Sequence, residues 1–312
     1  MTTLPEKHQT AATGTSHCEP AGTKAAPFIG CHVSDVTYRQ VVEILLEEQN
    51  FHLEGYKDQC IRRRLAARMR ASGSPDAEDY ISLLRADVQE QEYLLAALSV
   101  HVSQFFRNMS LFNMLEKSIV PQLLERARQE RSKLRIWSVG CAYGEEPYSL
   151  ALLFRKHLEQ KDLLSIIATD LSSEALRQAR QGCFPADRIN QVPTDMVREF
   201  FVEKERKYQL DEKIRQMVQF FRHDILTDQP FYRAELILCR NLLIYFSREQ
   251  QKQILEKLAE ALLPGGYLVL GRAETLAPAC RELFHCVDPA ERIYQRIVTD
   301  GQLHQLSKMF AV

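Results

Sequence analysis

Three side chains with useful chemistry stand together in the segment 239–246. Arg240, Asn241 and Tyr245 follow the apolar run 234–238, which is typical of a buried strand. Ligands of open α/β sheets bind outside the carboxyl ends of the strands. A strand that only closed a core would have little reason to end in this trio. The segment therefore predicts a binding site at the carboxyl end of this strand.

A turn with two glycines marks a second candidate site. Gly140 and Gly144 follow the predicted strand 135–139 and precede a predicted helix. Glycine lets the backbone approach a ligand closely, although a plain tight turn explains the two residues equally well. The segment is not a dinucleotide-binding Gly-x-Gly-x-x-Gly motif, and it lacks the Lys-Ser or Lys-Thr pair of a phosphate loop.

Two glutamates begin the helix after this turn. Glu145 and Glu146 suit the positive end of the helix dipole, and that alone could explain them. As ligand contacts, two carboxylates would repel a pyrophosphate and attract a cation. They therefore favour a cofactor such as S-adenosylmethionine, which carries an amine and a sulfonium, over a dinucleotide.

Acidic residues also follow the next predicted strands. Asp170 ends the run 166–169, which is the usual place for a carboxylate that binds ribose hydroxyls. Its alternative role is an N-cap for the helix that begins near Ser172. Asp224 follows the run 217–221 and could contact an adenine amino group or simply turn the chain. With the glycine turn, Asp170 indicates an adenosine-type cofactor.

The composition is that of an ordinary globular protein. The 312 residues are 45% hydrophobic and 26% charged with a net charge of −1, so no global field points to nucleic acid or to a membrane surface. No apolar run is long enough to span a bilayer, and the N-terminus lacks a signal pattern. The eight cysteines show no metal-binding spacing, which predicts reduced thiols, no metal and a cytoplasmic location.

The apolar periodicity divides the chain into four parts. Residues 1–30 lack periodicity and are predicted to form a disordered tail, and residues 297–312 a second tail. Residues 31–120 are predicted to form an all-helical domain. Its first helix is capped at Ser34 or Asp35, and the others are expected at 56–70, 76–85, 88–100 and 110–120. Residues 121–296 are predicted to form an α/β domain.

Strands and helices alternate in this second domain. Strands are expected at 134–139, 166–169, 236–239 and 267–270, and helices at 144–158, 173–181 and 247–263. The alternation predicts a mostly parallel, Rossmann-like sheet with helices on both faces. Ser247 and Gln250 fit a capping box at the last helix. Residues 184–220 are predicted to be an inserted lobe, with 207–210 and 217–221 as short antiparallel strands.

The helix 56–70 is unusually basic. Ile61, Leu65 and Met69 form one apolar stripe, and arginines occupy much of the remaining surface: Arg62, Arg63, Arg64, Arg68 and Arg70. The helix could simply be solvated on that side. Its alternative role is a docking surface for acidic helices, reached by electrostatic steering. Nucleic acid is a poorer partner, because no aromatic residues are interleaved with the cations.

Several ordered motifs together resemble the CheR-type chemotaxis receptor methyltransferases. These motifs lie at 104–107, 135–149, 168–170, 239–246 and 263–271, and the resemblance runs from about residue 34 to 296. It implies a class I S-adenosylmethionine-dependent methyltransferase fold, with a small antiparallel β insertion and an all-α N-terminal domain. The implied reaction transfers a methyl group to glutamate side-chain carboxylates on cytoplasmic helices of methyl-accepting chemoreceptors, and it yields S-adenosylhomocysteine.

The resemblance also assigns roles to residues. Together with the glycine turn, it gives a set of cofactor contacts: His101, Ser103, Arg107, Gly140, Glu146, Asp170, Asp224, Ile225, Arg240 and Asn241. Arg107 would also position the reacting carboxylate, and Tyr245 would place its hydroxyl near the methyl group. Because the family's basic helix is associated with receptor recognition, Arg62, Arg63, Arg64 and Arg68 become the expected docking residues.

Some residues depart from the family pattern. His101 replaces a usual asparagine, Tyr143 a small residue, and 272–274 a His-Ser-Glu sequence, which puts cofactor affinity in question. Some relatives hold a receptor's tethering peptide in the inserted lobe with a glycine-rich turn. This chain has no glycine between Gly182 and Gly265, so no tether is expected. A monomer is expected. The alternatives are a methyltransferase of another signalling system or of a small molecule, and a non-catalytic scaffold.

Overall fold

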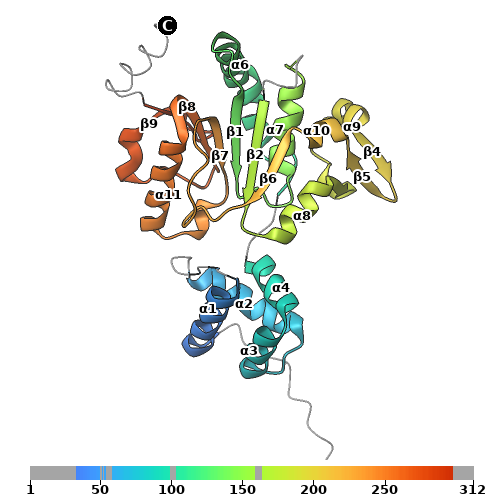
Figure 1. Cartoon of the computed structure of the whole chain (residues 1–312), viewed down its shortest axis with the longest axis vertical. Coiled ribbons are helices and arrows are strands. Elements are labelled where there is room, and N and C mark those ends of the chain that lie inside the picture. Colours follow the sequence, from blue (N-terminus) through green and yellow to red (C-terminus); the bar gives the residue numbers. More distant parts are fainter. Residues whose placement is uncertain are drawn as a thin grey trace, which may run out of the picture.

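The computed structural model describes residues 33–49, 51, 53, 58–98, 103–158 and 164–297. The predicted tails therefore lie outside the described residues, apart from Ile297. Within these ranges the chain forms a helical domain and a larger α/β domain, which meet at one end of the central sheet (Figure 1).

Among the described residues, the helical domain has four amphipathic helices. They are α1 (Asp35–Gln49), α2 (Asp58–Ser72), α3 (Ala77–Ala86) and α4 (Val88–Leu98). Residues four apart share one face of a helix, so Ile61, Leu65 and Met69 of α2 all enter the core of this domain. The Ser34 hydroxyl accepts a hydrogen bond from the Thr37 N–H at 3.1 Å, which confirms the predicted cap of α1.

The α/β domain has a seven-stranded sheet with the order β6-β2-β1-β7-β8-β10-β9. The strands are β1 (Leu134–Val139), β2 (Leu164–Asp170), β6 (Val218–Arg222), β7 (Ala234–Cys239), β8 (Leu262–Leu270), β9 (Phe284–Asp288) and β10 (Ile293–Arg296). Strands β6, β2, β1, β7 and β8 are mutually parallel, and β10 is antiparallel to β8 and β9. This confirms the predicted mostly parallel sheet, while β9 and β10 went unpredicted.

Alternate residues of the central strands face opposite sides of the sheet. Ile136 and Leu238 belong to the core under α7 (Glu145–Arg155) and α8 (Ser173–Gln181). Trp137 and Ile237 belong to the core under α11 (Arg248–Ala261). The Ser247–Gln250 capping box predicted for α11 is present. Helices therefore cover both faces, as predicted.

The boundary between the domains differs from the prediction. The helical run after residue 108 consists of α5 (Met109–Met114), a π-helical turn (Leu115–Ile119) and α6 (Val120–Gln129). Most of its apolar residues, such as Leu111, Phe112 and Leu115, are buried with Phe105 and Phe106 in the core of the sheet and not in the helical domain. The cores divide between Leu98 and Phe105, so the predicted boundary near residue 120 is wrong. The helical pattern predicted the element but not the surface on which it packs.

The inserted lobe is a three-stranded antiparallel sheet in the order β3-β5-β4. Its elements are β3 (Cys183–Pro185), α9 (Thr194–Phe200), β4 (Phe201–Lys204), β5 (Lys207–Leu210) and α10 (Glu212–Arg215). The predicted strand 207–210 is confirmed as β5. The segment 217–221 was predicted as a second strand of this lobe, and that is wrong. It forms β6, which pairs in parallel with β2 and buries Val218 and Phe220 in the main core.

Candidate functional site

The chain reverses its direction of travel across the sheet between β1 and β7. From β1 it proceeds to β2 and β6 on one side, and then returns to β7 and β8 on the other. At such a switch point the loops after the two strands separate and leave a crevice. Here the loops that follow Val139 and Cys239 border it.

A cleft occupies this position and has two connected parts. The larger part extends toward β2 and the helical domain and is lined by Thr169, Asp170 and Leu98 among others. The smaller part is lined by Ser103, Arg107 and Glu146 among others. Four residues line both parts: Gly140, Ala142, Asn241 and Tyr245. The structure therefore brings the predicted trio and the glycine turn together.

The two glycines of the turn have different roles. Both have positive φ, at 70° for Gly140 and 93° for Gly144. Gly140 lines both parts of the cleft. Gly144 begins α7, where an added Cβ would lie 3.1 Å from the Ala179 Cβ of α8. Gly140 thus serves ligand access, and Gly144 serves close packing of two helices.

Asp170 fixes the glycine turn from the next strand. Its Oδ2 accepts the Ala142 N–H at 2.9 Å, and its Oδ1 accepts the Ser172 N–H at 2.9 Å. The side chain that caps α8 is Ser172, whose Oγ accepts the Ala175 N–H. The alternative role of Asp170 as the helix cap is therefore excluded. The carboxylate lies at the cleft and holds the backbone that lines it.

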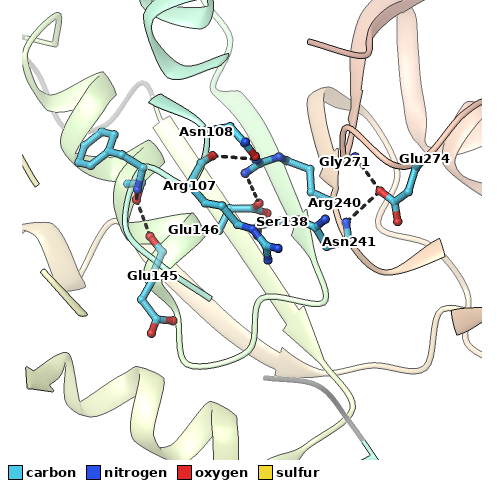
Figure 2. A network of polar contacts seen from close by, with 11 residues as sticks. Arg107, Asn108, Ser138, Glu145, Glu146, Arg240, Asn241, Gly271 and Glu274 are labelled. Atoms are coloured by element: carbon cyan, nitrogen blue, oxygen red, sulfur yellow. Dashed lines mark hydrogen bonds and ion pairs between the residues drawn. The ribbon is translucent and has the colours of Figure 1, made fainter. Parts of the chain in front are cut away.

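An ion pair beside the cleft joins the ends of three segments (Figure 2). Arg240 Nη1 lies 3.0 Å from Glu146 Oε2, and the Ser138 hydroxyl donates to Glu146 Oε1 at 2.8 Å. Arg240 Nη2 donates to the Arg107 carbonyl at 2.7 Å and to Asn108 Oδ1 at 2.8 Å. Only 2% of the Arg240 side chain is exposed. The pair ties the ends of β1 and β7 to the segment that carries Arg107.

The two glutamates at the start of α7 do not act together. Glu146 lines the smaller part of the cleft, whereas Glu145 is buried outside its lining. Glu145 Oε1 lies 3.1 Å from Arg188 Nη1, which also donates to the Ser103 carbonyl at 2.8 Å. The prediction that both carboxylates face a cationic ligand is therefore wrong for Glu145, and the charge of Glu146 is shared with Arg240.

Glu274, for which the sequence predicted no role, shapes the end of β7. Its Oε2 accepts the N–H groups of Asn241 and Gly271 at 2.9 and 2.6 Å, and its Oε1 accepts the Ile244 N–H at 3.3 Å. Asn241 has a φ of 59°, in the left-handed region that asparagine adopts more readily than most residues with a side chain. Burial raises the pKa of the Glu274 carboxyl, and these N–H donors oppose the rise. The only sequence signal was an acid in the loop after a strand.

The remaining predicted cofactor contacts that the structure describes also line the cleft. Asp224 and Ile225 line the larger part, together with the buried and unpredicted His223. Arg240 and Asn241 line the smaller part with Ser103 and Arg107. His101 lies outside the described residues, so its predicted role stays a prediction.

Three of the four predicted docking arginines have partners within the protein. Arg62 Nη2 lies 2.9 Å from Asp35 Oδ1, and Arg68 forms an ion pair with the buried Glu90. Arg64 donates to the Leu98 carbonyl, and its guanidinium lies 5.0 Å from the ring centroid of Tyr245. Arg63 is exposed. Of the four predicted docking arginines, Arg63 therefore remains the candidate for contact with a receptor.

The described part of the chain gives no sign of two other kinds of site. It holds no cluster of three or more His, Cys, Asp or Glu side chains that could bind a metal ion. None of its helices is long and apolar enough to cross a membrane.

Burial raises the pKa of the Cys141 thiol within the glycine turn, so this thiol is protonated and packs as an apolar group.

Comparison with known proteins gives the family. Residues 101–293 match the family model "CheR methyltransferase, SAM binding domain", and residues 37–99 match "CheR methyltransferase, all-alpha domain". These matches divide the chain where its two cores divide.

Curated relatives agree with the family models. The chain is 33% identical over 239 residues to the chemotaxis protein methyltransferase of Listeria monocytogenes, which covers 77% of this chain and 90% of that protein. It is 30% identical over 262 residues to chemotaxis protein methyltransferase 2 of Vibrio cholerae, with 81% and 90% covered. It is also 34% identical to an uncharacterized 104.1 kDa protein of Rhodobacter capsulatus, of which it spans only 27%.

A solved structure, the DszA carbon methyltransferase, matches 76% of this chain and 50% of that chain at 17% identity, with a TM-score of 0.35. The assignment therefore stands on the family models and the curated relatives. The chain belongs to the CheR methyltransferase family and is an S-adenosylmethionine-dependent methyltransferase.

Proposed function

We propose that the chain methylates glutamate side chains on cytoplasmic helices of chemoreceptors. The adenosine end of the cofactor would occupy the larger part of the cleft, and its amino-acid end would extend into the smaller part, where Glu146 and Arg240 lie. The observation that carries the proposal is the shared lining of the two parts. Asn241 and Tyr245 line both, and Arg107 lines only the smaller part. A cofactor that extends across both parts and a carboxylate held near Arg107 would therefore meet beside Tyr245. The relatives named as chemotaxis protein methyltransferases support the receptor as the substrate.

The residues at the larger part of the cleft suit an adenosine-type cofactor. The left-handed turn at Gly140 and Ala142 leaves backbone exposed to the cleft without a large side chain. Asp170 presents a carboxylate beside that turn, where ribose hydroxyls bind in related folds. Asp224 and Ile225 follow β6 and would contact the adenine ring.

The proposed reaction needs no general base. A glutamate carboxylate in water has a pKa of about 4.3, so it is already ionised at neutral pH. When bound, the cofactor supplies an electrophilic methyl group on a sulfonium, and a carboxylate oxygen displaces the thioether in one step. The protein must hold the carboxylate in line with that methyl group and exclude water. Catalysis therefore depends on positioning.

Arg107 and Tyr245 are the residues assigned to this positioning. The Arg107 backbone is held by Arg240, and its side chain lies beside Glu146 and Asn241 in the smaller part of the cleft (Figure 2). A guanidinium can orient the acceptor carboxylate, but a tight salt bridge would also reduce its nucleophilicity. We assign Arg107 to orientation and the Tyr245 hydroxyl to a contact near the methyl group.

The test is transfer of radiolabelled methyl groups from the cofactor to a receptor cytoplasmic fragment. The expected product is a base-labile ester on the fragment. Arg107→Ala and Tyr245→Phe should each lose at least about tenfold in kcat, the scale of one lost contact in the transition state. The matched control is Tyr267→Phe, which removes only a hydroxyl bonded to Gln122 Oε1 at 3.0 Å on another part of the sheet domain.

Three outcomes would contradict the proposal. If no receptor fragment were labelled, chemoreceptors would be ruled out as the substrate. A base-stable product would rule out a glutamate methyl ester. Wild-type turnover in both cleft variants would remove the roles of Arg107 and Tyr245. Loss of turnover in Tyr267→Phe as well would show that the assay reports folding instead of chemistry.

A further inference from the structure

Two neighbouring arginines of α2 have different surroundings. Arg63 is exposed, whereas Arg64 is partly buried. Arg64 Nη1 donates to the carbonyl of Leu98, the last residue of α4. The Arg64 guanidinium also lies over the ring of Tyr245, with Cζ 5.0 Å from the centroid. Arg64 therefore reaches from the helical domain to the cleft of the methyltransferase domain.

Both partners of Arg64 suit a guanidinium. The carbonyl at the end of a helix has no partner within that helix, and a cation there also suits the helix dipole. The face of an aromatic ring attracts a cation within about 6 Å of its centroid. A planar guanidinium can donate a hydrogen bond in its plane while its face rests on a ring, which an ammonium cannot do.

Tyr245 is held on its other side by its own domain. It ends a short 3-10 turn, Leu243–Tyr245, whose first peptide groups are tied to Glu274. The Tyr245 N–H donates to the Leu242 carbonyl at 3.2 Å. These contacts fix the backbone but leave the ring to be placed by its neighbours. Arg64 is one such neighbour, and it comes from the other domain.

We infer that Arg64 is a positioning residue that holds the Tyr245 ring at the cleft and thereby couples the seating of the helical domain to methyl transfer. This inference rests on the proposed function, because it takes Tyr245 to face the reacting groups. It differs from the role that sequence analysis gave Arg64, which was docking of the receptor.

The chemistry of the reaction favours such a role over direct contact with the acceptor. Attack of a carboxylate on a sulfonium cancels two charges, so the transition state is less polar than the reactants. A guanidinium that bound the acceptor carboxylate tightly would stabilise the reactants more than the transition state, and only the reverse accelerates a reaction. In Arg64 the guanidinium is already engaged by the Leu98 carbonyl and the Tyr245 ring.

The kinetic test compares Arg64→Ala with its exposed neighbour, Arg63→Ala. Arg64→Ala should lower kcat by about tenfold or more, the scale of a misplaced catalytic group. Its receptor KM and its affinity for S-adenosylhomocysteine should stay within about twofold of wild type, less than one lost surface ion pair costs. Arg63→Ala should give the opposite split, with KM raised roughly threefold and the change abolished by salt.

Arg64→Lys separates charge from geometry. It keeps the cation but cannot hold the carbonyl and the ring at once, so kcat should stay below about half of the wild-type value. Full restoration of kcat by lysine would overturn the inference. So would an Arg64→Ala variant with wild-type kcat and a raised KM, because that result makes Arg64 a docking cation like Arg63.

A second readout needs no receptor and so separates this inference from the proposed function. Amide hydrogen exchange of the segment 243–246 is measured in the protein bound to S-adenosylhomocysteine. Exchange should be faster by about fivefold in Arg64→Ala than in wild type or Arg63→Ala, as in a segment that opens locally, with β1 unchanged as the folding control. Equal exchange in all three proteins would overturn the role of Arg64 even if receptor methylation is shown. If exchange were faster in Arg64→Ala but the protein methylated no receptor, the positioning role of Arg64 would stand and the proposed receptor substrate would be wrong.

Discussion

The two sides of the cleft are held in different ways. On the side of the sheet, carboxylates bind the backbone of the cleft loops at hydrogen-bond distances: Asp170 to Ala142, Glu274 to Asn241, and Glu146 through Arg240 to the Arg107 carbonyl. On the side of the helical domain, the contacts include the Arg64 guanidinium on the Tyr245 ring, a 3.3 Å hydrogen bond from Arg222 to the Gln49 carbonyl, and the apolar contact of Leu171 with the helical core.

This difference separates two properties of the enzyme. Removal of one partner from a buried ionic or hydrogen-bonded contact lowers the free energy of unfolding by several kcal/mol. Removal of one partner from an exposed polar contact lowers it by about 1 kcal/mol or less. The cofactor side should therefore keep its shape when the helical domain is disturbed, but the placement of Tyr245 should not. Cofactor affinity then reports mainly the sheet domain, which supplies the described lining of the larger part apart from Phe51 and Leu98, and turnover reports the contact between the domains.

The largest effect is expected at Arg240. Arg240→Ala leaves Glu146 without its ion-pair partner in a site where the two side chains are 2% and 13% exposed. Removal of one partner of a buried pair costs about 3–5 kcal/mol. Urea unfolding should show a loss of unfolding free energy of this size, and calorimetry should show that S-adenosylhomocysteine no longer binds.

Arg272→Ala is the matched control for Arg240. Arg272 also pairs with a glutamate in the sheet domain, at 2.7 Å from Glu291 Oε1, but its side chain is 52% exposed. Its loss should cost about 1 kcal/mol or less. Equal losses of unfolding free energy in the two variants would mean that burial does not strengthen the ion pair on the cofactor side. The proposed difference between the two sides of the cleft would then be wrong.

An intermediate effect on the free energy of unfolding, which depends on pH, is expected at Glu274. Burial raises the pKa of this carboxyl above its ordinary value of 4.5. The folded state then binds a proton more tightly than the unfolded chain, so stability falls as the pH rises from the ordinary pKa to the raised one. Relative to Glu274→Gln, the wild type should gain unfolding free energy as the pH is lowered through the raised pKa toward the ordinary value of 4.5.

Glu274→Gln should also weaken cofactor binding. An amide presents an N–H group where one carboxylate oxygen accepted a backbone N–H, and such a mismatch costs about 1–3 kcal/mol. The control is Glu235→Gln, near the amino end of β7, where burial likewise raises the carboxyl pKa and Oε2 accepts the Arg135 N–H. Each variant should lose the part of the pH dependence that its own carboxyl contributes, but only Glu274→Gln should bind S-adenosylhomocysteine more weakly. A Glu235→Gln variant with equally weak binding would show that the effect is not local.

The features that sequence analysis predicted are those with a local pattern. A pattern of only a few residues is enough to recognise the strands around Trp137 and Ile237 and the Ser247 cap. The segment 217–221 was correctly predicted as a strand, but an alternation of apolar residues cannot tell which strand lies beside it. The same limit explains the domain boundary, because an amphipathic helix shows that it has an apolar face without showing what covers it.

The parts of the site that sequence analysis missed are contacts between distant segments. Asn241 could be found because it follows a strand, but the carboxylate that holds its backbone is 33 residues further along the chain. Arg64 was correctly seen as one of a basic set, and only the fold shows that it differs from Arg63 by facing Tyr245. Residue types thus predicted which groups take part in the chemistry, while their mutual positions required the tertiary structure.

The smallest effect is expected at Arg222, whose Nη2 donates to the Gln49 carbonyl at 3.3 Å in an exposed position. Arg222→Ala should change the unfolding free energy by about 0.5 kcal/mol or less, the usual range for an exposed substitution. Cofactor affinity should be unchanged, because Arg222 does not line the cleft. Turnover should remain within about twofold of wild type, as expected for a weak exposed contact. A tenfold loss of kcat with intact cofactor binding would show that this edge contact also seats the helical domain. The coupling between the domains would then be spread over their whole contact surface instead of resting on Arg64 and Tyr245.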